Sequence, residues 1–289
     1  MSDGYFPAGS MLRRVQSERA VGLLYGQRAL MVGSLHPLAF IGTTQRSKAH
    51  KRPWRRLMQT AEFFEAIFFG TREEADRALA ITERMHDRVR GDIPAAAGPF
   101  PAGTSFSAYD PELMMWVVAP MYDSACVLYE LLVKPLKPLE REQLWNDYRR
   151  FGELFGMPRE AAPPTVAALD AWWDERRNSD EIFLTPAARA VGRSIGTRIP
   201  VPAYARAPMR AANLVLVGSL PPWIREEYGM SWSPGEELAF RTIAAASRAG
   251  RPFTPAAVKR GSCLPMYGLV EKQERARLSA GKSALEMAA

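Results

Sequence analysis

Short polar residues placed directly before a proline mark where helices can begin along this chain. The side-chain oxygen of Ser, Thr or Asp can accept hydrogen bonds from the free amides of a first helical turn, and proline is tolerated at the first helical position. This signal occurs at Asp110-Pro111, Thr185-Pro186, Ser233-Pro234 and Thr254-Pro255. Thr71-Arg-Glu-Glu74 adds a capping box, in which the two side chains satisfy each other's free backbone amides.

Apolar residues recur three or four positions apart along nearly the whole chain, which predicts an all-α fold. Helices are expected at 15–27, 29–43, 53–69, 72–90, 111–133, 138–156, 165–178, 186–195, 204–219, 234–249 and 265–279. Val201 and residues 214–217 are the only strand candidates, and the latter sit in a helical context. Residues 92–108, rich in Gly, Pro and Ala, are predicted to form a long loop that could be a lid or a passive connector.

Composition limits the class of protein. A hydrophobic content of 47% in 289 residues suffices for a large core, and we expect one multi-helix domain over residues 1–289. Two cysteines exclude a disulfide framework and a cysteine-built zinc site. The net charge of +7 is spread along the chain, without a nucleic-acid motif, so no nucleic-acid partner is expected.

The apolar stretches of the sequence indicate whether the protein is expected to span a membrane. The N-terminus lacks the continuous apolar run of a signal peptide. Residues 29–44 are too few to span a bilayer, and residues 114–133 contain Pro120, Asp123 and Glu130, which are costly in lipid. We expect both stretches to be buried helices of a cytoplasmic protein without an integral membrane segment.

Histidine is scarce, with His36, His50 and His86 all in the first third of the chain. His86 shares a helical stripe with Ala75, Leu79, Thr82 and Val89, so it is predicted to point inward. A buried imidazole needs a partner, which can be a hydrogen bond in the core or a role in metal binding or catalysis. His36 is expected to be buried and His50 to be exposed. The motifs HExxH, CxxCH, GxGxxG and GxSxG and the P-loop are absent, so the sequence offers no standard zinc, c-type haem, nucleotide or serine-hydrolase site.

The predicted helix 53–69 places Arg56 and Thr60 on one face, which Phe63 and Ile67 continue. Arg56 is therefore expected to be partly buried beside aromatic rings. A buried guanidinium is costly unless a carboxylate or an anionic ligand neutralises it. The partner can be a protein acid or a bound anion.

These segments together resemble one family, the oxygenase domain shared by bacterial rubber oxygenase (latex clearing protein) and the fungal mycophenolic acid pathway oxygenase B. The resemblance covers roughly residues 20–240. It is carried by Leu35-His36-Pro37, His50-Lys-Arg-Pro-Trp-Arg-Arg-Leu-Met-Gln-Thr60, Phe69-Gly70-Thr71, Met85-His86-Asp-Arg-Val-Arg-Gly91, Tyr109-Asp110-Pro111-Glu-Leu-Met-Met-Trp116, Pro135-Leu-Lys-Pro-Leu-Glu-Arg-Glu142 and Phe155-Gly156-Met-Pro158.

The resemblance implies an all-helical fold with a globin-like centre and a non-covalently bound b-type haem. The family's rubber oxygenase cleaves carbon–carbon double bonds of polyisoprene with dioxygen. His86 matches the proximal iron ligand, and Arg56 and Thr60 match the pair that helps to hold the haem.

Three positions depart from the family pattern. Gln59 replaces a lysine that can reach the distal iron position, Phe40 falls where an acidic base is expected, and Val118 stands where relatives often carry a histidine. Rubber cleavage is therefore not implied.

We expect a haem b oxygenase that acts with dioxygen on a hydrophobic, isoprenoid or lipid-like small molecule. The helices at 29–44 and 114–133 would wall its substrate pocket. One alternative is a non-haem metal enzyme or histidine-based catalyst using His36, His50 and His86, with Glu62 or Asp123 completing the site. The other is a non-catalytic protein that binds haem or a lipid.

Overall fold

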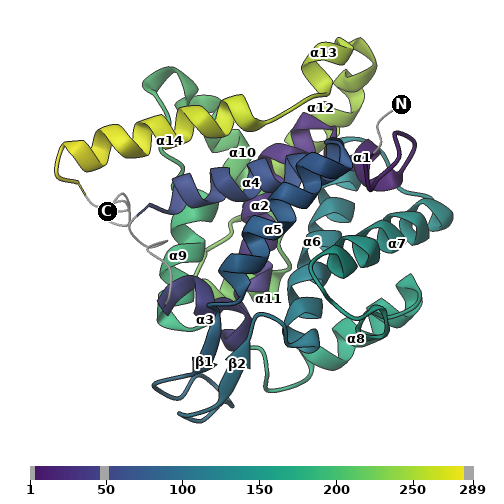
Figure 1. The fold of residues 1–289 in the computed structure, drawn as a ribbon. Helices are drawn as coiled ribbons and strands as arrows, with labels where there is room; N and C mark the ends of the chain where they lie inside the picture. The colour runs from purple at the N-terminus through teal and green to yellow at the C-terminus, as the bar shows by residue number, and fades with distance from the viewer. Residues whose placement is uncertain (1–3, 46–51, 283–289) are drawn as a thin grey trace.

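A computed structural model describes residues 4–45 and 52–282, with backbone only for residues 42–45. The predicted all-α class is confirmed, because helices make up nearly all of the regular structure (Figure 1). The helices are α1 (Met11–Gln16), α2 (Arg19–Gly33), α3 (Pro37–Gln45), α4 (Pro53–Phe69), α5 (Arg72–His86), α6 (Pro111–Leu132), α7 (Pro138–Leu154), α8 (Val166–Arg177), α9 (Pro186–Thr197), α10 (Arg206–Gly218), α11 (Pro222–Glu227), α12 (Pro234–Gly250), α13 (Ala256–Lys259) and α14 (Leu264–Ser279).

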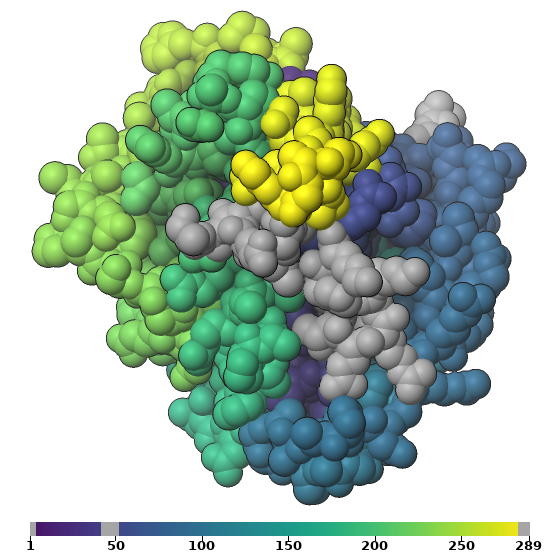
Figure 2. Space-filling model, turned by 90° about the vertical axis from the view of Figure 1, so that its left-hand side faces the viewer, coloured from purple at the N-terminus to yellow at the C-terminus, as the bar shows by residue number. Residues whose placement is uncertain are grey.

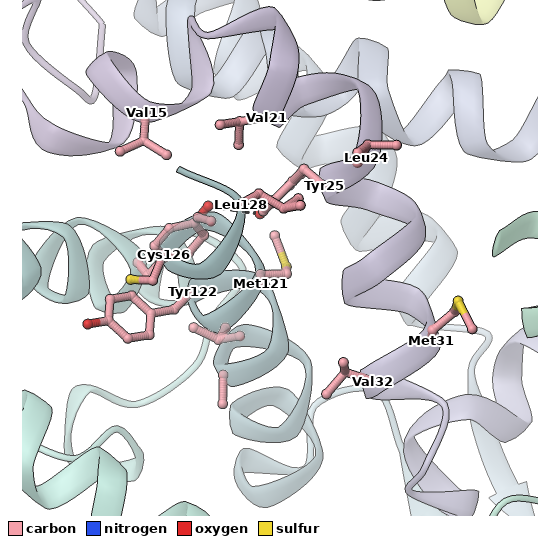
Figure 3. Packing of buried hydrophobic residues seen from close by; sticks show 14 of the residues in the cluster. Val15, Val21, Leu24, Tyr25, Met31, Val32, Met121, Tyr122, Cys126 and Leu128 are labelled. Atoms are coloured by element: carbon pink, nitrogen blue, oxygen red, sulfur yellow. Dashed lines mark hydrogen bonds between the residues drawn. The ribbon is translucent and has the colours of Figure 1, made fainter. Parts of the chain in front are cut away.

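Helices α2 and α6 pack against each other at the centre of the molecule. Their facing side chains, among them Tyr25 and Val32 of α2 and Met121 and Leu128 of α6, belong to one buried apolar cluster (Figure 3). Helix α6 is buried along most of its length because it also packs against α7 and α12. A helix with apolar residues on all sides is suited to such a central position.

A buried charge lies within this α2–α6 contact. Arg28 of α2 is only 2% exposed. Its guanidinium donates to the Asp123 carboxylate (2.5 Å) and to the Ser124 hydroxyl (3.0 Å) of α6. It also donates to the hydroxyl (3.2 Å) and the carbonyl oxygen (3.1 Å) of Ser219, which follows α10. One side chain thus joins three segments that are distant in sequence.

Most predicted helix starts are confirmed. The Thr71–Glu74 capping box is present, and Asp110, Thr185 and Ser233 each accept a hydrogen bond from the first turn of the helix that follows. The prediction for Thr254 was wrong. Its hydroxyl donates to the Gly250 carbonyl oxygen (3.0 Å) at the end of the preceding turn, so it does not cap α13.

The predicted boundary between helices 15–27 and 29–43 was also wrong. Helix α2 continues through Arg28, whose side chain is fixed in the core, and ends at Gly33. The chain turns at residues 34–36 before Pro37, which has no amide hydrogen to continue a helix. Residues 214–217 lie in α10, as their helical context indicated.

The prediction that residues 92–108 form only a loop needs correction. Strand β1 (Arg90–Asp92) pairs antiparallel with β2 (Ser105–Ser107), and Gly91 lies opposite Phe106. Phe106 is buried against Ile93 and Leu38, which anchors the ribbon to α3. Strands of three residues are too short to show an alternating pattern, so they could not be predicted from the sequence.

The sequence predicted that the protein has no integral membrane segment. In the ranges 4–45 and 52–282, no helix combines the length and the apolar character needed to cross a bilayer.

Substitution of the buried arginine tests the central contact. Arg28→Ala leaves Asp123 and two serine hydroxyls without their partner, and we expect it to lower the free energy of unfolding by about 3–5 kcal/mol. Chemical denaturation measures this change. Arg14→Ala is the control, because Arg14 forms an exposed ion pair with Glu140, and it should cost less than about 1 kcal/mol. Equal effects of the two substitutions would contradict the role given to Arg28.

Candidate functional site

Helices α4 and α5 pack against each other and carry the predicted site residues. On α4 the apolar stripe is inward as predicted, with Leu57 and Phe68 buried and Phe64 half-buried. On α5 the stripe is also inward, since Ala75 and Thr82 are buried. The sequence therefore predicted correctly which face of each helix meets the core.

The start of α4 is held by the C-terminal helix. The Glu274 carboxylate of α14 is fully buried and accepts hydrogen bonds from the amides of Trp54 (3.0 Å) and Arg55 (3.1 Å). A carboxylate at a helix N-terminus also interacts favourably with the helix dipole. Burial raises the pKa of the Glu274 carboxyl, and the two amide hydrogen bonds oppose that rise. Helix α14 lies over α4 in Figure 1, so it fixes where the helix bearing Arg56 begins.

His86 is the last residue of α5 and is half-buried, as the stripe predicted. Two aromatic side chains lie near its ring. The ring centroids of Tyr109 and Phe155 are 6.1 Å and 6.2 Å away, respectively. The segments before α6 and after α7 thus each place one aromatic ring near the imidazole.

The surroundings of His86 favour the neutral form of its imidazole, because they lower its pKa. Burial lowers the pKa of His86, the nearby positive charge of Arg56 lowers it further, and Asp87 opposes both effects. A neutral imidazole retains a nitrogen lone pair, which is the form that can bind a metal ion. Arg56 and His86, thirty positions apart, are thus brought together by the α4–α5 contact.

Arg56 and Thr60 are both half-buried, in agreement with the predicted face. Burial lowers the pKa of the Arg56 guanidinium. The Thr60 hydroxyl donates to the Arg56 carbonyl oxygen (3.1 Å), so its hydrogen is used within α4. The neighbouring Arg55 is exposed and pairs with Glu271 (2.9 Å).

Two residues at the site were not among the predicted site residues. The Tyr109 hydroxyl donates to the Asp87 carboxylate (2.9 Å) and lies 3.2 Å from the Glu83 carbonyl oxygen, which ties it to the last turn of α5. The pKa of Tyr109 is raised to about 12. Burial is the largest cause, and the hydrogen bond to Asp87 is the second. Phe155 is the C-cap of α7. Both residues occur in the sequence segments that carry the family resemblance. Their place in those segments was the signal by which they could have been predicted.

His36 occupies a different environment. It is 6% exposed, as predicted, and its ring lies 5.3 Å from that of Phe100 and 5.2 Å from that of Trp116. Its Nδ1 accepts a hydrogen bond from the Ala39 amide (3.4 Å) at the start of α3. Burial lowers the pKa of His36 to about 4, with a further contribution from the positive charge of Arg176.

The other predicted ligands are dispersed. Asp123 pairs with Arg28, and Glu62 is exposed. His50 lies outside the described residues. Within the part of the chain that the structure describes, no group of three or more His, Cys, Asp or Glu side chains could hold a metal ion.

The structure also shows where the three residues that depart from the family pattern lie. Phe40 and Val118 are buried apolar residues of α3 and α6, and Gln59 is exposed on α4. Neither Phe40 nor Val118 can act as a base or a metal ligand.

The sequence matches the family described as ER-bound oxygenase mpaB/B'/rubber oxygenase, catalytic domain, over residues 13–249. The chain belongs to this family. Membership supports an oxygenase-like activity of the oxidoreductase class, with dioxygen and a small-molecule substrate. It also confirms the resemblance inferred from the motifs.

Two mycobacterial relatives are similar over most of the chain. They are uncharacterized proteins of Mycobacterium bovis and Mycobacterium tuberculosis, each 27% identical over 209 residues, which is 71% of this chain and 78% of the relative. No solved structure matches the chain.

The buried His36 predicts a pH-dependent stability. Because its pKa is lower in the folded state, the unfolded chain binds the proton more readily, so stability falls as the pH drops from about 6.5 towards about 4. Between pH 7 and pH 5 we expect a loss of about 2 kcal/mol from this group. Urea denaturation at both pH values measures it, and His36→Asn should remove that part of the loss. A variant with the wild-type pH dependence would contradict the prediction.

The Glu274 cap predicts a long-range effect on α4. Glu274→Ala leaves two amides without acceptors, and we expect the free energy of unfolding to fall by about 2 kcal/mol. Lys272→Ala, at an exposed position of the same helix, should change it by less than about 0.5 kcal/mol. Chemical denaturation measures the free energy of unfolding of both variants. A Glu274→Ala variant with the wild-type free energy of unfolding would show that α14 does not hold α4.

Proposed function

We propose that the protein is a b-type haem-dependent oxygenase that acts with dioxygen on a hydrophobic, isoprenoid or lipid-like small molecule. The observation that carries the proposal is that Arg56 lies near enough to His86 for its charge to lower the pKa of the imidazole. A half-buried imidazole, whose pKa is lowered by burial and by the charge of Arg56, and that half-buried guanidinium come from the two helices that pack at the α4–α5 contact.

The donor set fits a haem. A haem carries one iron that takes a neutral imidazole and two propionates that favour a cation. His86 supplies the imidazole and Arg56 the cation, and the rings of Tyr109 and Phe155 provide apolar surface beside the imidazole. Thr60, one turn after Arg56 on the same face, completes the predicted set.

The chain's own residues would bind the haem, orient the substrate and exclude water from the site. His86 would hold the iron, and Tyr109 would keep the last turn of α5 in place through Asp87. Buried apolar residues of α3 and α6, such as Phe40, Met115 and Val118, would form a dry wall for a hydrophobic substrate. A bound haem supplies the dioxygen chemistry, which protein side chains do not supply.

The geometry gives less support to a non-haem metal enzyme. His36 and His86 contact different sets of aromatic residues, and the proposed carboxylates are exposed or already paired. A non-catalytic haem protein remains a second candidate, because Phe40 replaces the acidic base and Gln59 replaces the lysine of the family pattern.

An absorption spectrum of the purified protein tests the proposal. We expect a Soret band in the wild type and its loss in His86→Ala, because that substitution removes the imidazole that would hold the haem iron. Arg56→Gln should weaken haem binding at least tenfold, whereas the matched control Arg55→Gln, at an exposed neighbouring position, should not. Haem titration followed at the Soret maximum measures these affinities.

The outcomes separate the candidates. A colourless protein that contains one equivalent of metal and keeps it in His86→Ala would contradict the haem assignment. A red protein that binds haem through His86 but consumes no dioxygen with unsaturated hydrophobic substrates would support the non-catalytic candidate instead.

A further inference from the structure

Helix α9 and the residue that follows it place three arginines around a hollow of about 320 Å³. The hollow is lined by Pro186, Arg189, Ala190, Arg193 and Arg198. Arg189 and Arg193 are four positions apart and share a face of α9, and Arg198 is the residue that follows the helix. Figure 2 views the molecule from the side on which α9 lies.

These three guanidinium groups have no partner among the described residues, since none of them forms an ion pair or donates a hydrogen bond there. Arg193 and Arg198 are nevertheless half-buried. Burial and the positive charge of Arg193 lower the pKa of Arg198. Like charges held together in a partly buried hollow are costly unless an anion compensates them.

The local sequence offers no compensating charge. Residues 182–225 contain six arginines and no aspartate or glutamate. The first turn of α9 likewise has no acidic residue, although acidic side chains are favoured there by the helix dipole. The charge therefore has to be balanced by a group outside this stretch.

A second arginine-lined hollow shows what internal compensation looks like. It has a volume of about 630 Å³ and is lined in part by Arg52, Arg55 and Arg275. The Glu271 carboxylate lies 3.9 Å from Arg52, 2.9 Å from Arg55 and 3.1 Å from Arg275. The hollow on α9 has no such acid among its lining residues.

We propose that the hollow on α9 binds a phosphomonoester dianion. Guanidinium groups form paired hydrogen bonds with phosphate oxygens, and three of them match a dianion better than a single carboxylate. The volume accommodates a phosphoryl group together with the first atoms attached to it. This site is independent of the proposed haem site, because it shares no residue with it.

Calorimetry with inorganic phosphate and pyrophosphate at low ionic strength tests the proposal. We expect one saturable site in the wild type and at least a tenfold weaker affinity in the double variant Arg193→Gln/Arg198→Gln. Arg275→Gln is the matched control, since it removes one arginine from the other hollow, and it should bind as the wild type does. Equal binding by all three proteins, or none by the wild type, would overturn the proposal.

The double variant also has to be shown to fold. Without ligand, removal of two repelling charges should leave its melting temperature equal to or above that of the wild type. In wild type, pyrophosphate should raise the melting temperature, and in the double variant this shift should disappear. A double variant that melts lower and still shows the shift would contradict the inference.

Vesicles distinguish the two sources of a phosphomonoester. Sedimentation with phosphatidic acid vesicles, but not with phosphatidylcholine vesicles, and its loss in the double variant would identify a lipid headgroup as the ligand. Binding of pyrophosphate without sedimentation would identify a free phosphorylated compound. Both results support the site, and sedimentation that is equal in the double variant and the wild type would count against it.

Discussion

The hydrogen bonds of the buried Arg28 guanidinium hold the central helices in their arrangement. The guanidinium is compensated by one carboxylate, two hydroxyls and one carbonyl oxygen from α6 and the end of α10. Apolar packing between α2 and α6 is not directional, whereas these hydrogen bonds are satisfied in one alignment of the two helices. The central pair is thereby fixed, and the remaining helices pack around it (Figure 1).

The candidate site depends on a segment beyond the family's catalytic domain. The family match ends at residue 249, and α14 begins at Leu264. Glu274 of α14 nevertheless caps α4, the helix that carries Arg56 and Thr60. A helix end whose amides are capped frays less, so the position of Arg56 relative to His86 is set partly by the C-terminal helix.

Arginines in this protein differ in how their charge is compensated, and the difference indicates function. Arg28 is balanced by Asp123 inside the core, and the arginines near α14 are balanced by Glu271. The charge of Arg56 lowers the pKa of His86, and Arg189, Arg193 and Arg198 line the hollow at α9. The hollow on α9 has no acidic residue in its lining, and an uncompensated cluster of charges of this kind is where an anionic ligand gains most binding energy.

The sequence alone was enough to predict the local features of the helices. It predicted the bounds of α4, the capping box of α5 and the inward faces that bury His86 and Arg56, because capping and helical periodicity act over a few residues. Which distant residues contact each other became visible only in the folded chain. Tyr109 joins Asp87 across 22 positions, and Glu274 joins Trp54 across 220. Such pairs leave no periodic trace in the sequence, since the packing of distant helices and not the spacing along the chain brings them together.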